Sequence, residues 1–236
     1  MQTYYSIRWG TRKDVKQTGN YIKFNIFIHI KSSLEIIDMD NNGINAYLNQ
    51  MFLINKRMDA ILNIGLGEKS TLFKYTNIEF MTLQIRKIIE HIAMANLIVN
   101  KDLYSRYNEK FASNWNARCI FRGIEKINPR FYPEPVKTNN NTIPKQWIKV
   151  DNYLTKDEAI DVYDKCGALM HVSNPYRAQI DINYYDSHIH IWYNKILNLL
   201  NQHIIQLVDE EKLLCIVMRG DEKGMPHGYE FIKVDG

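Results

Sequence analysis

A chain of 236 residues, 45% of them hydrophobic, can bury a substantial core, and we expect one domain over residues 1–236. Charged residues make up 24% and the net charge is +4, so the chain has no basic tail typical of nucleic-acid binding, although an anionic partner is permitted. The three cysteines are widely spaced without a Cys-x-x-Cys pair, which argues against a disulfide framework and a structural zinc site. With no signal peptide and no membrane-spanning stretch in the sequence, we expect a cytoplasmic protein without membrane contact.

Strands are predicted near both ends of the chain. Strict alternation of apolar and polar residues predicts a half-buried strand over 21–30, with a partner strand over 4–9. Apolar runs over 213–218 and 229–234 predict a closing pair of strands. We expect a small antiparallel sheet in which the C-terminal pair lies beside the N-terminal strand, with peripheral strands at about 4–30 and 212–235.

Helical periodicity between these strands predicts a body of about five helices over residues 45–207. After a break at 40–43, Asn45 can cap a helix over 46–63, which Gly65 and Gly67 end. The longest helix, over 76–100, has a Thr76-x-x-Glu79 capping box and a wide apolar stripe that predicts a central position.

Three further helices complete the predicted body. They cover residues 103–127, 155–170 and 186–208, and the second opens with a Thr155-x-x-Glu158 capping box. The proline-rich stretch over 130–147 is predicted to be an extended, surface-running connection. The fold class is therefore mainly α (α+β), a helical bundle with a small antiparallel sheet.

The longest helix carries a compact polar cluster, Arg86, Glu90 and His91, inside an apolar run. A guanidinium can stabilise charge on phosphorus, and an imidazole can move the proton of a 2′-hydroxyl, which together suffice for metal-free RNA cleavage. Five residues rotate about 140° along an ideal helix, however, whereas four residues return to one face. Arg86 and Glu90 can therefore also form a structural ion pair, with His91 bonded elsewhere in the bundle.

The spacing of Arg86 and His91 resembles the Arg-x4-6-His motif of the HEPN superfamily. This resemblance implies a metal-independent endoribonuclease on a four- or five-helix bundle, with a composite site across a homodimer and Arg86 and His91 as the catalytic pair. The chain has Lys87 after the arginine, where these nucleases commonly have Asn, Asp or His.

The strings IRKIIEHIA, INPRFYPEPV and LTKDEAIDVYDKCGALMHVSNPY resemble an uncharacterised group of bacterial proteins. This second resemblance implies that an Arg-x3-Glu pair, here Arg86 and Glu90, matters more than His91, and it makes His171 an alternative imidazole. His171 and Asn174 would then meet the Arg86 cluster across the bundle, where Gly167 permits close approach of the helices. The alternative is that His171 donates to free carbonyls at the end of its helix.

A row of basic residues predicts a surface that contacts a phosphate backbone, with stacking on Tyr104, Tyr107 and Trp115. The candidates are Lys87, Arg106, Lys110, Arg118 and Arg122, with Lys126 in the same row. A solvated helix face is the alternative. His188 and His190 have a spacing known from metal ligands, but on a helix they diverge by about 200°, so no metal and no other cofactor is expected.

Two functions follow from these patterns. The first is a HEPN-like bacterial protein that acts on RNA in stress or antiviral defence, with Arg86 and either His91 or His171 in catalysis. Its partners would be RNA, a second copy of the chain, and a protein that neutralises it in the manner of an antitoxin. The second is a non-catalytic binding or regulatory helical protein in which Arg86 and Glu90 are structural.

Overall fold

The computed structural model describes residues 21–22, 40–107, 113, 115–139, 146–172, 176, 179–207, 212–220 and 224–232. The described part of the chain is mainly helical with an antiparallel sheet, an α+β fold. Its helices are α1 (Asp40–Gly65), α2 (Lys74–Val99), α3 (Lys101–Tyr107), α4 (Ala117–Glu125), α5 (Lys156–Leu169) and α6 (Ile182–Leu200). Its strands are β1 (Tyr21–Ile22), β2 (Glu134–Asn139), β3 (Gln146–Lys149), β4 (Gln202–Gln206), β5 (Lys212–Val217) and β6 (His227–Ile232).

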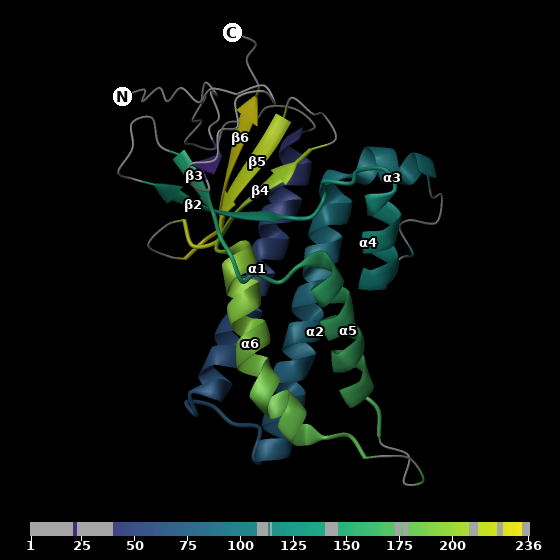
Figure 1. The fold of residues 1–236 in the computed structure, drawn as a ribbon, viewed down its shortest axis with the longest axis vertical. Coiled ribbons are helices and arrows are strands. Elements are labelled where there is room, and N and C mark those ends of the chain that lie inside the picture. Colours follow the sequence, from purple (N-terminus) through teal and green to yellow (C-terminus); the bar gives the residue numbers. More distant parts are fainter. Residues whose placement is uncertain are drawn as a thin grey trace.

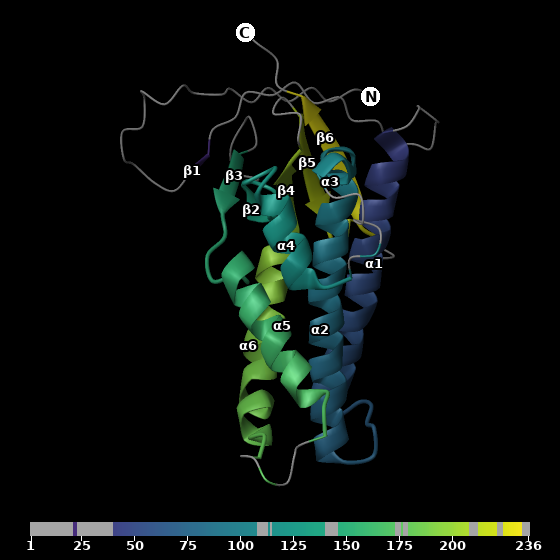
Figure 2. The same cartoon turned by 90° about the vertical axis from the view of Figure 1, so that its right-hand side faces the viewer.

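The sheet lies at one end of an elongated helical body (Figure 1). Its strand order is β1-β3-β2-β4-β5-β6, and all neighbouring strands are antiparallel. Helices α1 and α2 run side by side along the body, and α5 and α6 lie beside α2 (Figures 1 and 2). Because α2 contacts α1, α4, α5 and α6, the predicted central position of this helix is confirmed.

Strand β5 shows how the sheet packs on both of its faces. Leu214 and Ile216 belong to the main core, which the helices share. Leu213 and Cys215 alternate with them and face a second, smaller apolar cluster that includes Trp147. This two-residue alternation is the expected geometry of a strand covered on both sides.

Several local predictions are confirmed. The closing strands form the antiparallel pair β5–β6, with Cys215 opposite Tyr229. Thr155 and Glu158 form a complete capping box at the start of α5. Helix α1 ends at Gly65, and Gly67 follows with a φ of 75°, a left-handed conformation that glycine adopts without steric cost.

The predicted starts of the first two helices are wrong. Helix α1 already includes residues 40–43, where a break was predicted. Helix α2 begins at Lys74, and its N-cap, Phe73, has no side-chain capping bond. The hydroxyl of Thr76 is directed backwards, 2.8 Å from the carbonyl oxygen of Thr71 and 3.0 Å from that of Phe73, so it bonds within the preceding turn and does not form the predicted capping box.

The predicted helix over 103–127 is interrupted. It is replaced by α3 and α4, and Asn116 caps the start of α4 by accepting a hydrogen bond from the backbone N–H of Cys119 at 3.2 Å. The side chain of Asn116 thereby satisfies a free donor at a helix end, which marks a true helix start.

The proline-rich stretch is not a surface connection, because it supplies β2 and β3 to the sheet. Val136 is buried in β2 and Trp147 in β3. Pro135 is accommodated near the start of β2, where this strand pairs with β4 over only two residues, Glu134 and Pro135.

The last predicted helix is shifted and too long. Helix α6 begins after Asp181, whose side chain caps it, and ends at Leu200. Residues 202–206 form β4, in which His203, Ile204 and Ile205 are all buried. A short apolar run of this kind fits either a helix or a buried strand, so periodicity alone misassigned it.

Only Tyr21 and Ile22 of the predicted N-terminal strands belong to the described residues. They form β1, which pairs with β3 and not with the C-terminal strands. The prediction that the N-terminal strand lies beside the C-terminal pair is therefore wrong, because β3, β2 and β4 lie between β1 and β5.

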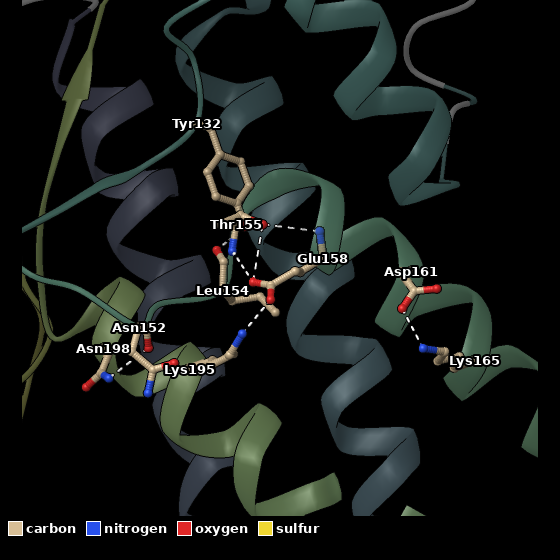
Figure 3. A network of polar contacts seen from close by, with 9 residues as sticks. All are labelled: Tyr132, Asn152, Leu154, Thr155, Glu158, Asp161, Lys165, Lys195 and Asn198. Carbon is tan, nitrogen blue, oxygen red and sulfur yellow. Dashed lines mark hydrogen bonds and ion pairs between the residues drawn. The ribbon is translucent and has the colours of Figure 1, made fainter.

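A polar network fixes the start of α5 to its surroundings (Figure 3). The backbone N–H of Thr155 donates to Glu158 Oε2 at 3.1 Å, and Lys195 of α6 forms an ion pair with the same carboxylate. Burial alone would raise the pKa of Glu158, but the hydrogen bonds from Lys195 and Thr155 outweigh burial and lower it. The hydroxyl of Tyr132 donates to the carbonyl of Leu154 at 3.0 Å. These contacts hold α5 against α6 and so position the face of α5 that meets α2.

Candidate functional site

Arg86 points from α2 towards α5. Its Nη1 donates to the carbonyl oxygen of Tyr163 at 2.8 Å, and its guanidinium lies over the Tyr163 ring, 3.8 Å from the centroid. A Cβ at Gly167 would lie 2.6 Å from Arg86 Nη1, so glycine at this position makes room for the guanidinium. Gly167 thus permits the close approach of α5 to α2 that the sequence predicts. Arg86 is therefore used to join two helices.

Glu90 completes this cluster on α2. Its Oε1 lies 3.5 Å from Arg86 Nε, and its Oε2 lies 2.7 Å from Lys87 Nζ. The side chains of Arg86 and Glu90 are only 18% and 16% exposed, so the pair is largely desolvated and neither charge is presented to solvent as a free group. Arg86 and Glu90 thus meet on one face of α2, as expected for residues four apart on a helix.

His91 points from α2 towards a different helix, α1. Its Nδ1 lies 2.7 Å from the side-chain oxygen of Gln50, and because that oxygen can only accept, Nδ1 carries the proton. Burial, together with the smaller effects of the positive charges of Arg57 and Lys87, lowers the pKa of His91 to about 4, although Glu90 opposes this shift. The imidazole is therefore neutral near pH 7 and is a weak base.

Arg86 and His91 consequently bond to opposite neighbours of α2. The first bonds to α5 and the second to α1. A general base and a charge-stabilising cation must both reach one reacting phosphate, so this divergence within the chain is unfavourable for catalysis by the pair.

His171 is exposed, and it follows Met170, the C-cap of α5. Among the described residues, no hydrogen bond or ion pair connects His171 with Arg86 or Glu90. Asn174 lies outside the described residues. The structure therefore does not bring the alternative imidazole to the Arg86 cluster.

The predicted phosphate-contacting residues fall into two groups. Lys87 is paired with Glu90, and Arg118 of α4 is paired with Asp164 of α5. Arg106 and Arg122 are exposed and have no ion-pair partner among the described residues, and Lys110 lies outside those residues. Among the described residues, Arg106 and Arg122 are therefore the predicted cations without an ion pair.

Helices α3 and α4 adjoin each other, and both carry exposed cations without an ion-pair partner among the described residues. A Cβ at Gly123 would lie 2.3 Å from the hydroxyl of Tyr104, so α3 packs closely against α4 at this point. The side-chain nitrogen of Asn128 donates to Asn100 Oδ1 at 2.9 Å and ties the end of α4 to the start of α3. Tyr104 is buried in this contact, and the prediction that it stacks on a ligand is therefore wrong.

We define the α3–α4 basic surface as the exposed side chains of Lys101, Arg106, Tyr107, Trp115, Arg122 and Lys126. Its four cations have no ion-pair partner among the described residues, whereas the other helices and strands hold many of theirs in ion pairs. Lys101 was not predicted, because its position beside the end of α4 depends on the contact between Asn100 and Asn128. Helices α3 and α4, which carry this surface, lie on the side of α2 away from α1 (Figure 1).

In the described part of the chain, no group of three His, Cys, Asp or Glu side chains is arranged to hold a metal ion. His188 stacks on Tyr184, with 3.9 Å between the ring centroids. None of the described helices is long and apolar enough to cross a membrane.

Comparison with protein-family models, with curated proteins and with solved structures finds no match to this chain. The resemblances to HEPN ribonucleases and to the bacterial group therefore stay predictions.

Proposed function

We propose that this chain is a non-catalytic RNA-binding protein that holds the phosphate backbone on its α3–α4 basic surface. The supporting observation is that two adjoining short helices carry four exposed cations without an ion-pair partner among the described residues. Such cations release counterions from a nucleic acid when they contact its phosphates, and this release favours binding.

The arrangement on α2 supports binding without cleavage. Arg86 is held by Tyr163 and Glu90, and His91 is held by Gln50 on the opposite side of the helix. In this proposal these residues stabilise the bundle. A homodimer, a neutralising protein partner and a role in stress or antiviral defence stay predictions.

The binding test uses a fluorescently labelled 20-nucleotide RNA and measures anisotropy at several salt concentrations. We expect the double variant Arg122→Glu and Lys126→Glu to bind at least roughly tenfold more weakly, because two phosphate contacts are lost. The slope of log K against log salt should fall in magnitude by about 1.4, since each contact with a single strand contributes about 0.7.

The matched control is the charge reversal Lys69→Glu, which alters an exposed lysine in the connection between α1 and α2, far from this surface (Figure 1). This variant should bind with nearly unchanged affinity and salt dependence. Equal weakening by Lys69→Glu, or no RNA binding at low salt, would show that the α3–α4 basic surface is not an RNA site.

Cleavage is measured separately by incubating the same RNA with wild-type protein in EDTA. We expect the RNA to remain intact. Cleavage that is lost in both Arg86→Ala and His91→Ala would contradict a non-catalytic function and support the nuclease prediction.

A further inference from the structure

Two large aromatic side chains of the α3–α4 basic surface are exposed. Tyr107, the last residue of α3, is 76% exposed, and Trp115, just before α4, is 66% exposed. The other aromatic side chains of α3 and α4 that the structure describes are buried: Tyr104 lies between the helices, and Phe121 packs against Phe131. The two exposed rings therefore contribute little to the core.

The positions of the rings relative to the cations follow from the chain itself. Arg118, Arg122 and Lys126 follow one another at intervals of four residues, and residues at this spacing share one side of a helix. Trp115 lies just before Asn116, the N-cap of α4, and so stands at the start of the helix that carries this row. Tyr107 adjoins Arg106, which is itself exposed. Tyr107 thus adjoins a cation without an ion-pair partner among the described residues, and Trp115 precedes the helix whose Arg122 and Lys126 have none there either.

We infer that the ligand of this surface is a single strand whose unpaired bases stack on Trp115 and Tyr107. This inference rests on the proposed RNA binding and names the form of RNA. Aromatic rings beside cations bind single strands because every unpaired base offers a face for stacking while the backbone follows the positive charges. The bases of an A-form duplex are stacked on one another, so a duplex offers only its backbone and shallow groove to these rings.

The test compares a labelled single-stranded RNA with a duplex of the same sequence, using wild-type protein and Trp115→Ala. We expect the wild type to bind the single strand at least tenfold more tightly than the duplex. Trp115→Ala should lose about tenfold in affinity for the single strand, the size expected for one stacked base, and should bind the duplex almost as the wild type does.

Tryptophan fluorescence gives a second readout. Of the described tryptophans, Trp147 and Trp192 are buried whereas Trp115 is exposed, so among these three a stacked base should quench mainly Trp115. Trp9 lies outside the described residues, and comparison with Trp115→Phe separates its fluorescence from that of Trp115. We expect quenching by single-stranded RNA in the wild type and its loss in Trp115→Phe, which retains a ring for stacking and should keep most of the affinity. The matched control is Phe73→Ala, which removes an aromatic side chain that is 59% exposed just before α2 and should leave affinity and quenching unchanged.

The outcomes separate the inference from the proposed function. If single strand and duplex bind equally and Trp115→Ala has no effect, base stacking is overturned. Backbone binding nevertheless holds in that case if the double variant Arg122→Glu and Lys126→Glu binds RNA more weakly than the wild type. Absence of binding to both RNAs at low salt would overturn both.

Discussion

His203 of β4 is a buried histidine whose protonation should control stability towards acid. Its Nδ1 lies 2.8 Å from the carbonyl oxygen of Leu200 and must carry the proton, so the hydroxyl of Tyr47 on α1 donates to Nε2 at 2.9 Å. Burial lowers the pKa of His203 from 6.5 to about 4, although the hydrogen bond to Leu200 opposes this shift. The neutral imidazole joins the sheet to the first helix.

The expected loss of stability follows from this pKa. The unfolded chain binds a proton at His203 more readily than the folded protein does, so the stability due to the neutral imidazole is complete above pH 6.5 and is lost as the pH falls towards 4. The full shift corresponds to roughly 3 kcal/mol, since one pKa unit is about 1.4 kcal/mol. About 2 kcal/mol of this should be lost between pH 7.5 and pH 5.

The assay is urea unfolding at pH 7.5, 6 and 5, followed by circular dichroism, for the wild type and His203→Gln. The glutamine does not titrate, so the difference in free energy of unfolding between wild type and variant should shrink by about 2 kcal/mol between pH 7.5 and pH 5. His190→Gln, which alters an exposed histidine of α6, should give a profile parallel to that of the wild type. Parallel profiles for the wild type and His203→Gln would refute the assigned role of His203.

Two further predictions concern stability and are measured by urea unfolding at pH 7.5. Gly123→Ala should lower the free energy of unfolding by about 1–3 kcal/mol, because its Cβ would lie 2.3 Å from the hydroxyl of Tyr104. Its control, Gly65→Ala, meets no atom within 4 Å at the end of α1 and should raise stability by about 0.5 kcal/mol; equal effects of the two would contradict the close packing of α3 and α4. Thr155→Ala should cost about 1 kcal/mol by removing the hydroxyl that accepts from the backbone N–H of Glu158 at 3.3 Å, and an unchanged midpoint would show that the capping box contributes nothing.

The candidate site was only partly predictable from the sequence. The spacing of Arg86 and Glu90 was sufficient to predict that they meet, because residues four apart on a helix share a face. The partner of Arg86 was not predictable, since Tyr163 lies 77 positions away and its carbonyl is reached only when α5 packs on α2. Likewise, nothing local to His91 indicates that its imidazole meets Gln50 on α1.

The basic surface shows the same division. The row of cations on α4 is a local pattern that the sequence contains. Whether each cation is free depends on neighbouring helices, because Arg118 is paired with Asp164 of α5 while Arg122 has no ion-pair partner among the described residues. The predicted use of Tyr104 failed for a related reason, since Gly123 on α4 leaves a space that this ring fills.

The sequence by itself determined those features that depend on residues close in the chain. These are the α+β class, the capping box at Thr155, the end of α1 at Gly65 and the pairing of β5 with β6. Caps and hairpins are satisfied by groups a few positions apart, so local spacing is sufficient to predict them. Tertiary structure decided that the proline-rich stretch joins the sheet, because β2 pairs with β4, which is remote in the chain. Packing likewise decided that residues 202–206 form a strand, because a short apolar run fits either a helix or a buried strand. Tertiary structure also decided that Arg86 and His91 bond to different helices, and this divergence is the main argument against catalysis by the pair.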